Sequence, residues 1–109
     1  MPDAWVERYQ KEVLPKLTAT LRPSSVLLFG SRAAGTARAE SDLDVIIVAE
    51  AFAGIPFVRR MAYVLGLVRF PKHVDYLCYT REEFARIRES SSVVHGALRE
   101  CAELSAGGQ

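Results

Sequence analysis

Two aspartates, Asp42 and Asp44, stand two positions apart at the start of the apolar, β-branched run DLDVIIVA. On a β-strand, residues two apart point to the same face, so both carboxylates project together while Leu43 points into the core. Two carboxylates this close repel each other unless a cation or a proton lies between them. Oxygen ligands of this kind suit a hard ion such as Mg²⁺. The spacing therefore predicts a magnesium site where a strand begins.

A third carboxylate, Asp75, lies in another apolar segment, HVDYLCY. If this segment forms a strand beside the one that carries Asp42 and Asp44, three carboxylates converge at one edge of a sheet. Three carboxylates can hold two magnesium ions about 3.5–4 Å apart, the arrangement used for in-line phosphoryl and nucleotidyl transfer. Asp42, Asp44 and Asp75 are thus the predicted catalytic and metal-binding residues.

The turn that begins with Gly30-Ser31 follows the apolar run SVLLF. A glycine at the end of a strand lets the backbone approach a ligand closely, and the next amides, at a helix N-terminus, offer donors to phosphate. The Ser31 hydroxyl and the Arg32 guanidinium add side-chain donors. Gly30, Ser31 and Arg32 are the predicted nucleotide-binding residues, opposite the cation ligands. A P-loop is excluded because Thr36, and not lysine, follows Gly35.

Each of these features has a simpler interpretation when taken alone. An isolated Asp-x-Asp pair is commonly a turn residue followed by a solvated strand residue, and Gly-Ser is a common turn. Their conjunction, with ten residues between Ser31 and Asp42 in a strand–turn–strand context, favours a shared site. His73 and His95 lack a metal-ligand spacing, and we interpret them as a strand-edge residue and a packing or solvated residue.

Periodicity and turn signals predict the elements that position these residues. We expect a helix over residues 3–21 that kinks or divides at Pro15, strands over 25–29, 42–49 and 73–79, a helix from Pro56 to about Phe70, a capped helix from Thr80 to about Arg88, and a last helix from Val93 to Leu104. This order predicts an α/β (α+β) fold: a small mixed sheet of three or more strands flanked by helices, in a single domain over residues 1–109.

The helix expected after Pro56 carries two apolar stripes, where packing on a sheet needs only one. The first contains Val58, Met61, Leu65 and Val68, and the second contains Tyr63, Leu67 and Phe70. The second stripe is covered by the first or last helix, or it is a protein-binding face.

Composition restricts the class of protein. The chain is 50% hydrophobic and 25% charged, with a formal net charge of +1, so no global charge favours nucleic acid or an anionic membrane. The apolar stretch 61–68 is far shorter than the roughly 20 residues that span a bilayer. The first residues lack a secretion signal, and Cys78 and Cys101 have no CxxC spacing. We expect a cytoplasmic protein with free buried thiols.

The segments GSRAAG and SDLDV resemble the GS-x10-DxD signature of the DNA polymerase beta-like nucleotidyltransferase superfamily, and within it the minimal nucleotidyltransferase (MNT) group. The resemblance covers nearly the whole chain and implies the polymerase beta-like fold. It implies that Asp42, Asp44 and Asp75 bind magnesium, as two ions, and that Gly30 and Ser31 hold the triphosphate of the nucleotide. Members often carry a second arginine where this chain has Ala34, so a further phosphate contact is not expected there.

The same resemblance implies a partner, because minimal nucleotidyltransferases are similar to the antitoxins of MNT–HEPN toxin–antitoxin modules. The implied function is magnesium-dependent transfer of AMP from ATP to a hydroxyl, a tyrosine's, of a HEPN ribonuclease toxin in a hetero-oligomer. The chain is too short for a further domain that binds an acceptor such as tRNA. Two alternatives stay open: an antitoxin that neutralises its partner by contact without catalysis, and a nucleotidyltransferase that acts on a small molecule or, less in keeping with the charge, a nucleic acid.

Overall fold

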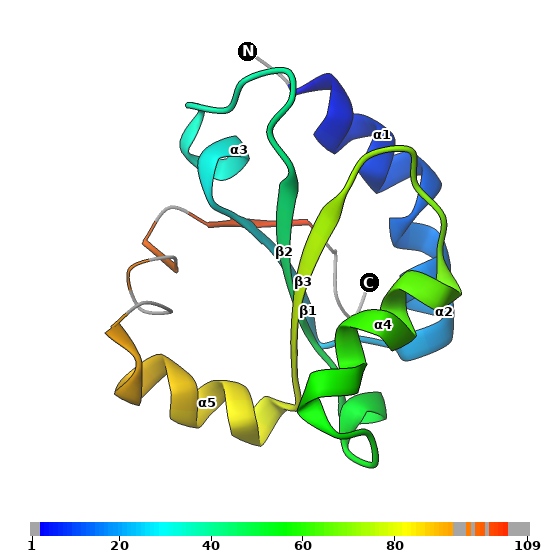
Figure 1. Ribbon diagram of the computed structural model, residues 1–109. Helices are drawn as coiled ribbons and strands as arrows, with labels where there is room; N and C mark the ends of the chain where they lie inside the picture. The colour runs from blue at the N-terminus through cyan, green and yellow to red at the C-terminus, as the bar shows by residue number, and fades with distance from the viewer. Residues whose placement is uncertain (1–2, 93–95, 97, 100, 105–109) are drawn as a thin grey trace.

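A computed structural model describes residues 3–92, 96, 98–99 and 101–104 (Figure 1). In chain order its elements are α1 (Ala4–Glu12), α2 (Leu14–Leu21), β1 (Ser25–Phe29), α3 (Ser31–Ala34), β2 (Leu43–Val48), the 3-10 helix η1 (Glu50–Phe52), α4 (Phe57–Leu67), β3 (Val74–Tyr79), α5 (Arg81–Ser90) and β4 (Ala102–Glu103).

The strands form one mixed sheet in the order β3-β2-β1-β4. β1 is antiparallel to both β2 and β4, whereas β2 and β3 are parallel. The connection from β2 to β3 runs through η1 and α4, as parallel strands require a crossover. The predicted fold class, a small mixed sheet flanked by helices, is confirmed.

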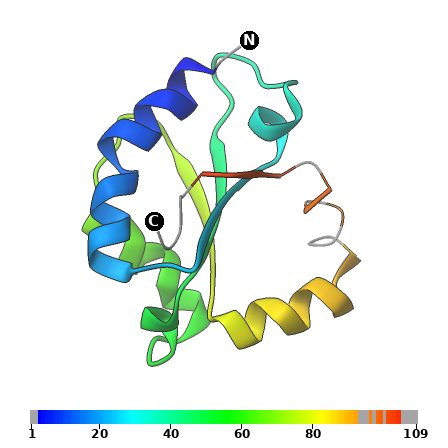
Figure 2. The same ribbon diagram turned by 180° about the vertical axis from the view of Figure 1, so that it is seen from behind.

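The two faces of the sheet are covered unequally. One face packs against α1, α2 and α4 and contains the larger buried cluster, which includes Val26, Leu28, Val45, Ile47, Val74 and Tyr76. The other face packs against α5 and Leu98 and contains Leu27, Ile46, Val48 and Tyr79. Figure 2, from behind, shows α1, α2 and α4 together on one side and α5 on the other. Because side chains alternate along a strand, Asp44 and Asp75 project from the second face.

The predicted break in the first helix is confirmed. Asp3 caps α1 by accepting hydrogen bonds from the amides of Trp5 and Val6, and α1 ends at Glu12 with Val13 as its C-cap. Pro15 lies in the first turn of α2, where its missing N–H costs nothing. The residues that face the sheet, such as Val13 and Leu17, are fully buried.

Helix α4 starts where expected but ends three residues before Phe70. The prediction that the first apolar stripe faces the sheet is wrong in part. Val58 and Leu65 of that stripe are exposed, and Val64, which is not in the stripe, is buried. Phe70 lies beyond the helix and packs edge-on against Trp5 and Tyr9 of α1, so the first helix covers part of the second stripe.

Helix α5 opens with the predicted capping box, in which Thr80 and Glu83 each bind the backbone amide of the other. The helix predicted from Val93 to Leu104 is only partly within the described residues, since positions 93–95, 97 and 100, and with them His95, lie outside them. Ser92, Gly96 and Leu98 are helical, but the last part of the prediction is wrong. Residues 102–103 form β4, because the edge of β1 offers free backbone groups and Leu104 becomes buried there.

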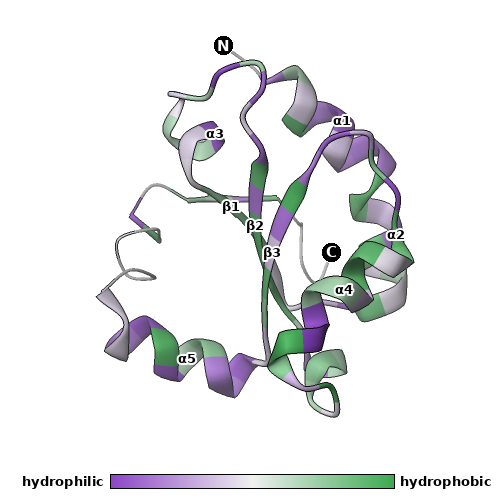
Figure 3. Ribbon diagram, in the orientation of Figure 1, coloured by the Kyte–Doolittle hydropathy of each residue, from purple (hydrophilic) through white to green (hydrophobic). Residues whose placement is uncertain are grey.

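No helix among the described residues is long and apolar enough to cross a membrane. Cys78 and Cys101 are both free, and Cys78 is buried while Cys101 is partly exposed. The strands are hydrophobic over most of their length, with a hydrophilic band near the start of β2 and β3 (Figure 3).

Candidate active site

The predicted carboxylates meet because β1 ends, and β2 and β3 begin, at the same end of the sheet. Phe29 of β1 pairs with Asp44 of β2, and Asp44 pairs in turn with Asp75 of β3. Asp42 lies one residue before β2, so it is outside the ladder and exposed, whereas its neighbour Leu43 is fully buried. The conditional prediction that β3 neighbours β2 is met.

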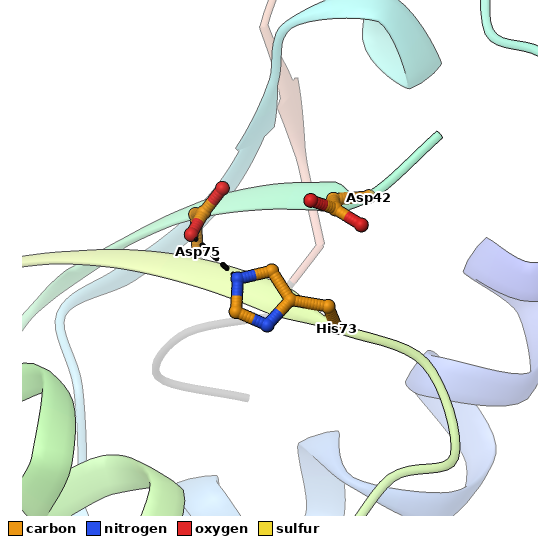
Figure 4. Close-up of side chains that lie close together, drawn as sticks. All are labelled: Asp42, His73 and Asp75. Carbon is orange, nitrogen blue, oxygen red and sulfur yellow. Dashed lines mark hydrogen bonds and ion pairs between the residues drawn. The ribbon is translucent and has the colours of Figure 1, made fainter. Parts of the chain in front are cut away.

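The tightest group at this end contains a residue that sequence reasoning missed. Asp42, His73 and Asp75 each offer a ligand atom, and these atoms all lie within 4.8 Å of one another (Figure 4). His73 Nε2 lies 2.8 Å from Asp75 Oδ1. The signal was present in the sequence, since His73 stands two residues before Asp75 just as Asp42 stands two before Asp44. In register, the two pairs lie side by side, and the amide of Leu43 donates to the carbonyl of His73.

Asp44, the third predicted carboxylate, is not a member of this group, but it is coupled to it by charge. Its partial burial raises its pKa, and the negative charges of Asp75 and Asp42 raise it further, while His73 acts in the opposite direction. In the same way, the hydrogen bond and charge of Asp75 raise the pKa of His73. The carboxylates are therefore held close at an electrostatic cost that a bound cation would relieve.

Gly30 leaves room for the carboxylate of Asp44. Its φ of 75° and ψ of −157° place it in a region open almost only to glycine. A Cβ at this position would overlap Oδ2 of Asp44 and press on its Cγ. Ser31, the first residue of α3, follows directly and is partly exposed. The predicted phosphate-binding turn is thus in contact with the predicted metal ligands.

Arg32 lies at the same end of the sheet but is engaged within the protein. Its side chain is only 4% exposed and forms an ion pair with Asp3. Its other nitrogens donate to backbone carbonyls of the loop before β2. The predicted contact of Arg32 with phosphate would require these hydrogen bonds to break, so the geometry favours a role within the protein.

The donor set fits a hard divalent cation. Asp42, Asp44 and Asp75 supply carboxylate oxygens, which magnesium prefers, and the half-exposed position leaves room for water and phosphate oxygens as further ligands. The imidazole of His73 adds a nitrogen donor that manganese or zinc also accepts.

A cavity of about 460 Å³ lies between the end of α4 and the start of β3, on the face of the sheet that carries Val74 and Tyr76. Of the described residues that line it, His73 is shared with the carboxylate group, and none is an aspartate. Arg69 and Lys72 also line it and give it positive charge.

Comparison of the sequence with protein families identifies one match. The family described as a nucleotidyltransferase domain matches residues 8–95, which include all the site residues named above. None of the curated proteins matches the sequence.

Solved structures with the same fold include three that cover most of this chain. A protein from Sulfolobus solfataricus, named as a candidate nucleotidyltransferase, has a TM-score of 0.61 and 21% identity, over 91% of this chain and 78% of that one. A toxin–antitoxin structure with AMP-PNP has a TM-score of 0.59 and 18% identity, over 92% and 75%. BolA1 from Arabidopsis thaliana has a TM-score of 0.54 and 23% identity, over 75% and 98%. At these identities the likenesses show the fold alone.

Proposed function

Because the chain belongs to the family of nucleotidyltransferase domains, we propose that it transfers AMP from ATP to a hydroxyl group of a partner protein. The observation that carries this proposal is the register of the sheet, which aligns Asp44 with Asp75, together with the close approach of the Asp44 carboxylate to Gly30. Anion-binding backbone thus faces cation-binding carboxylates, as a magnesium nucleotide requires.

In the proposed reaction, the acceptor hydroxyl oxygen forms a bond to the α-phosphorus of ATP. The bond from that phosphorus to the oxygen that bridges to the β-phosphorus breaks, and pyrophosphate leaves with the electron pair. The hydroxyl proton passes to Asp75, which His73 orients through its hydrogen bond. Gly30 and Ser31 hold the triphosphate.

Asp42, Asp44 and Asp75 would hold the magnesium ions, two in number by the count of carboxylates. Bound there, magnesium neutralises phosphate charge and lowers the pKa of the attacking hydroxyl. The protein's own contribution is to bring like charges together at a place where Gly30 leaves space, and to keep Asp44 partly buried.

The proposed acceptor is a tyrosine of a HEPN ribonuclease toxin, and the chain would act as its antitoxin in a cytoplasmic hetero-oligomer. The toxin–antitoxin neighbour, which holds AMP-PNP, an analogue of ATP, supports a protein partner and an adenine nucleotide in general. Exposed Phe57, Val58 and Leu65 on α4 offer apolar surface of the kind that partners cover.

The test is transfer of label from ATP labelled at the α-phosphate, with magnesium, to the protein encoded by the adjacent gene. We expect label on that protein, none from ATP labelled at the γ-phosphate, and loss of label when its acceptor tyrosine is replaced by phenylalanine. Asp42→Asn should abolish transfer. Glu82→Gln is the control, since Glu82 is an exposed acidic residue of α5, outside the site and outside the loop before β2.

Two other outcomes would point to the alternatives. If the partner co-purifies but takes no label, contact alone neutralises it and the transferase proposal fails. If label appears only in small molecules or nucleic acid of a cell extract, the chain is a nucleotidyltransferase with a different acceptor.

A further inference from the structure

The side chain of Arg32, in α3, contacts two segments that are separate from it in the sequence: the N-terminus of α1 and the loop before β2. Its Nη1 donates to both carboxylate oxygens of Asp3, at 2.9 and 2.7 Å. Its Nη2 donates to the carbonyls of Arg38, Ala39 and Ser41, at 3.0, 3.2 and 2.7 Å, and its Nε also donates to Ser41. A guanidinium that is almost wholly buried thus ties the N-terminus of α1 to the loop before β2.

Asp42 needs such support because the sheet does not hold it. Asp44 and Asp75 lie inside paired strands, where ladder hydrogen bonds fix the backbone. Asp42 lies before β2, and the carbonyl that precedes its amide is that of Ser41, the one to which Arg32 donates twice. The side chain of Ser41 also binds the amide of Arg38, which closes the loop on itself.

From these contacts, we infer that Arg32 is a positioning residue for Asp42: it fixes the loop 38–41 so that the exposed carboxylate of Asp42 stays within ligand distance of Asp75. The inference rests on the proposed function, since it assigns Arg32 to the same metal-binding group. In this role Arg32 does not make the phosphate contact that the sequence predicted, but holds the backbone of the loop before β2. Helix α1 contributes to the site because Asp3 binds Arg32.

Asp3 has two tasks in this arrangement. It caps α1 through the amides of Trp5 and Val6, and it neutralises Arg32. Burial alone would raise the pKa of Asp3, but the hydrogen bonds from Arg32 and from the two amides outweigh it and the pKa is lowered. Asparagine keeps the cap, because its side-chain oxygen also accepts from the helix amides, but it loses the charge. Asp3→Asn therefore weakens the hold on Arg32 without removing the helix cap.

A second buried arginine supplies a matched control. Arg60 is 5% exposed at its side chain, pairs with Glu83, and donates to the carbonyls of Ile55 and Cys78. These contacts lie at the far end of the sheet, where β3 ends. Replacing either arginine by lysine removes the fork that binds several acceptors at once. Loss of stability is common to both changes, whereas only one of them concerns the loop before Asp42.

The experiment measures the affinity for Mn²⁺, by electron paramagnetic resonance, at a temperature where every variant is folded by circular dichroism. We expect Arg32→Lys to weaken Mn²⁺ binding about 10–100-fold, as loss of a residue that orients a metal ligand does. Asp3→Asn should weaken it in the same direction, which keeps the test valid if Arg32→Lys does not fold. Arg60→Lys should lower the melting temperature and leave Mn²⁺ affinity unchanged.

Three results would overturn the inference. Wild-type Mn²⁺ affinity in folded Arg32→Lys and Asp3→Asn would show that Arg32 does not position Asp42. If Arg32→Lys binds Mn²⁺ as wild type does but binds metal-free ATP more weakly, Arg32 contacts the phosphates directly, as the sequence predicted. An equal loss in Arg60→Lys would show that general destabilisation is the cause. Asp42→Asn separates the proposals: if it binds Mn²⁺ as wild type does, the metal site itself fails.

Discussion

Charged side chains are arranged in opposite ways at the two ends of the sheet: they form an ion pair at one end and a cluster of like charges at the other. At the end where β3 finishes, Arg60 and Glu83 are paired, and the capping box and two backbone carbonyls satisfy their remaining groups. At the end where β2 and β3 begin, Asp42 and Asp75 lie in one group with His73, Asp44 pairs in register with Asp75, and no lysine or arginine pairs with these aspartates in the part of the chain that the structure describes. Within the described residues, the basic side chain that contacts them is His73, through Asp75.

The difference separates structural from functional charge. At the first end the pairing with Arg60 lowers the pKa of Glu83, and at the second end partial burial, together with the charges of Asp75 and Asp42, raises the pKa of Asp44. A group whose ionised form is favoured by folding stabilises the fold, and one whose ionised form is disfavoured destabilises it at neutral pH. Charged residues that lie close together and destabilise the fold are typical of a binding or catalytic site, where a bound ligand offsets their charge.

The largest expected effect is that of Asp44→Asn, which should reduce transfer of AMP below detection. The change should also raise the melting temperature at pH 7 without divalent ions. The reason is the sign of the shift: a raised pKa means that ionised Asp44 opposes folding above that pKa, and a neutral amide removes both the cost of burying the charge and the repulsion from Asp75 and Asp42. Scanning calorimetry with and without magnesium checks it.

Magnesium should reduce the difference in melting temperature between Asp44→Asn and wild type, because it binds and stabilises the folded wild type and not the variant. A melting temperature that falls in Asp44→Asn without divalent ions would contradict the contrast between the two ends, whatever happens to transfer.

The next effect is that of Gly30→Ala. The new Cβ would overlap the carboxylate of Asp44, and the backbone conformation is one that alanine rarely adopts, at a cost of about 1–3 kcal/mol. Transfer should fall with it, because Asp44 must move. Urea denaturation and the transfer assay together measure both. Gly35→Ala is the control: its φ is also positive, at 80°, but nothing lies within 4 Å, so it should lose stability and keep Mn²⁺ affinity. Equal loss of Mn²⁺ affinity in both variants would argue against the close approach.

At the opposite end, Glu83→Gln should change how stability depends on pH. The hydrogen bonds from Arg60, and then from the Thr80 amide, lower the pKa of Glu83 from 4.5 to about 2. A lowered carboxyl pKa contributes stability that is complete above the unfolded value and is lost as pH falls through the folded one. Wild type should therefore exceed Glu83→Gln in stability at pH 7, and the gap should close between roughly pH 4.5 and 2. A gap that is constant over this range would assign the effect to packing. Transfer at pH 7 should be unaffected.

The smallest expected effect is a gain. Gly66 lies in α4 with open space around its Cβ position. Gly66→Ala should stabilise the protein by about 0.5–1 kcal/mol, because alanine has less backbone freedom to lose. Chemical denaturation measures it, and transfer should stay at the wild-type rate. A loss of stability would mean that this part of α4 is more crowded than the structure shows.

Much of the fold could be predicted because local signals agree with the tertiary packing. The capping box at Thr80, the proline in the first turn of α2 and the β-branched run of β2 each act within a few residues. The strand β4 could not be predicted, because two residues have no period, and what makes them a strand is the open edge of β1, far away in the sequence. The orientation of α4 was missed for a similar reason, since both stripes are apolar, and the burial of Arg60 depends on Glu83, which is distant in the sequence.

The site divides along the same line. Gly30, Asp42, Asp44 and Asp75 were identified from spacing, and the sheet brings them together. Arg32 was also selected, as a donor to phosphate, because sequence alone cannot tell which acceptors a guanidinium will meet. Its acceptors, Asp3 and the carbonyls of the loop before β2, are determined by how α1 packs.

The most direct test of the central claim is a crystal structure of the protein with Mn²⁺ and AMP-PNP, with anomalous scattering recorded for manganese. The account predicts manganese between Asp42, Asp44 and Asp75, and the triphosphate against the amides that follow Gly30. Manganese held away from Asp44, or a triphosphate seated in the cavity between α4 and β3 beside Arg69 and Lys72, would contradict it.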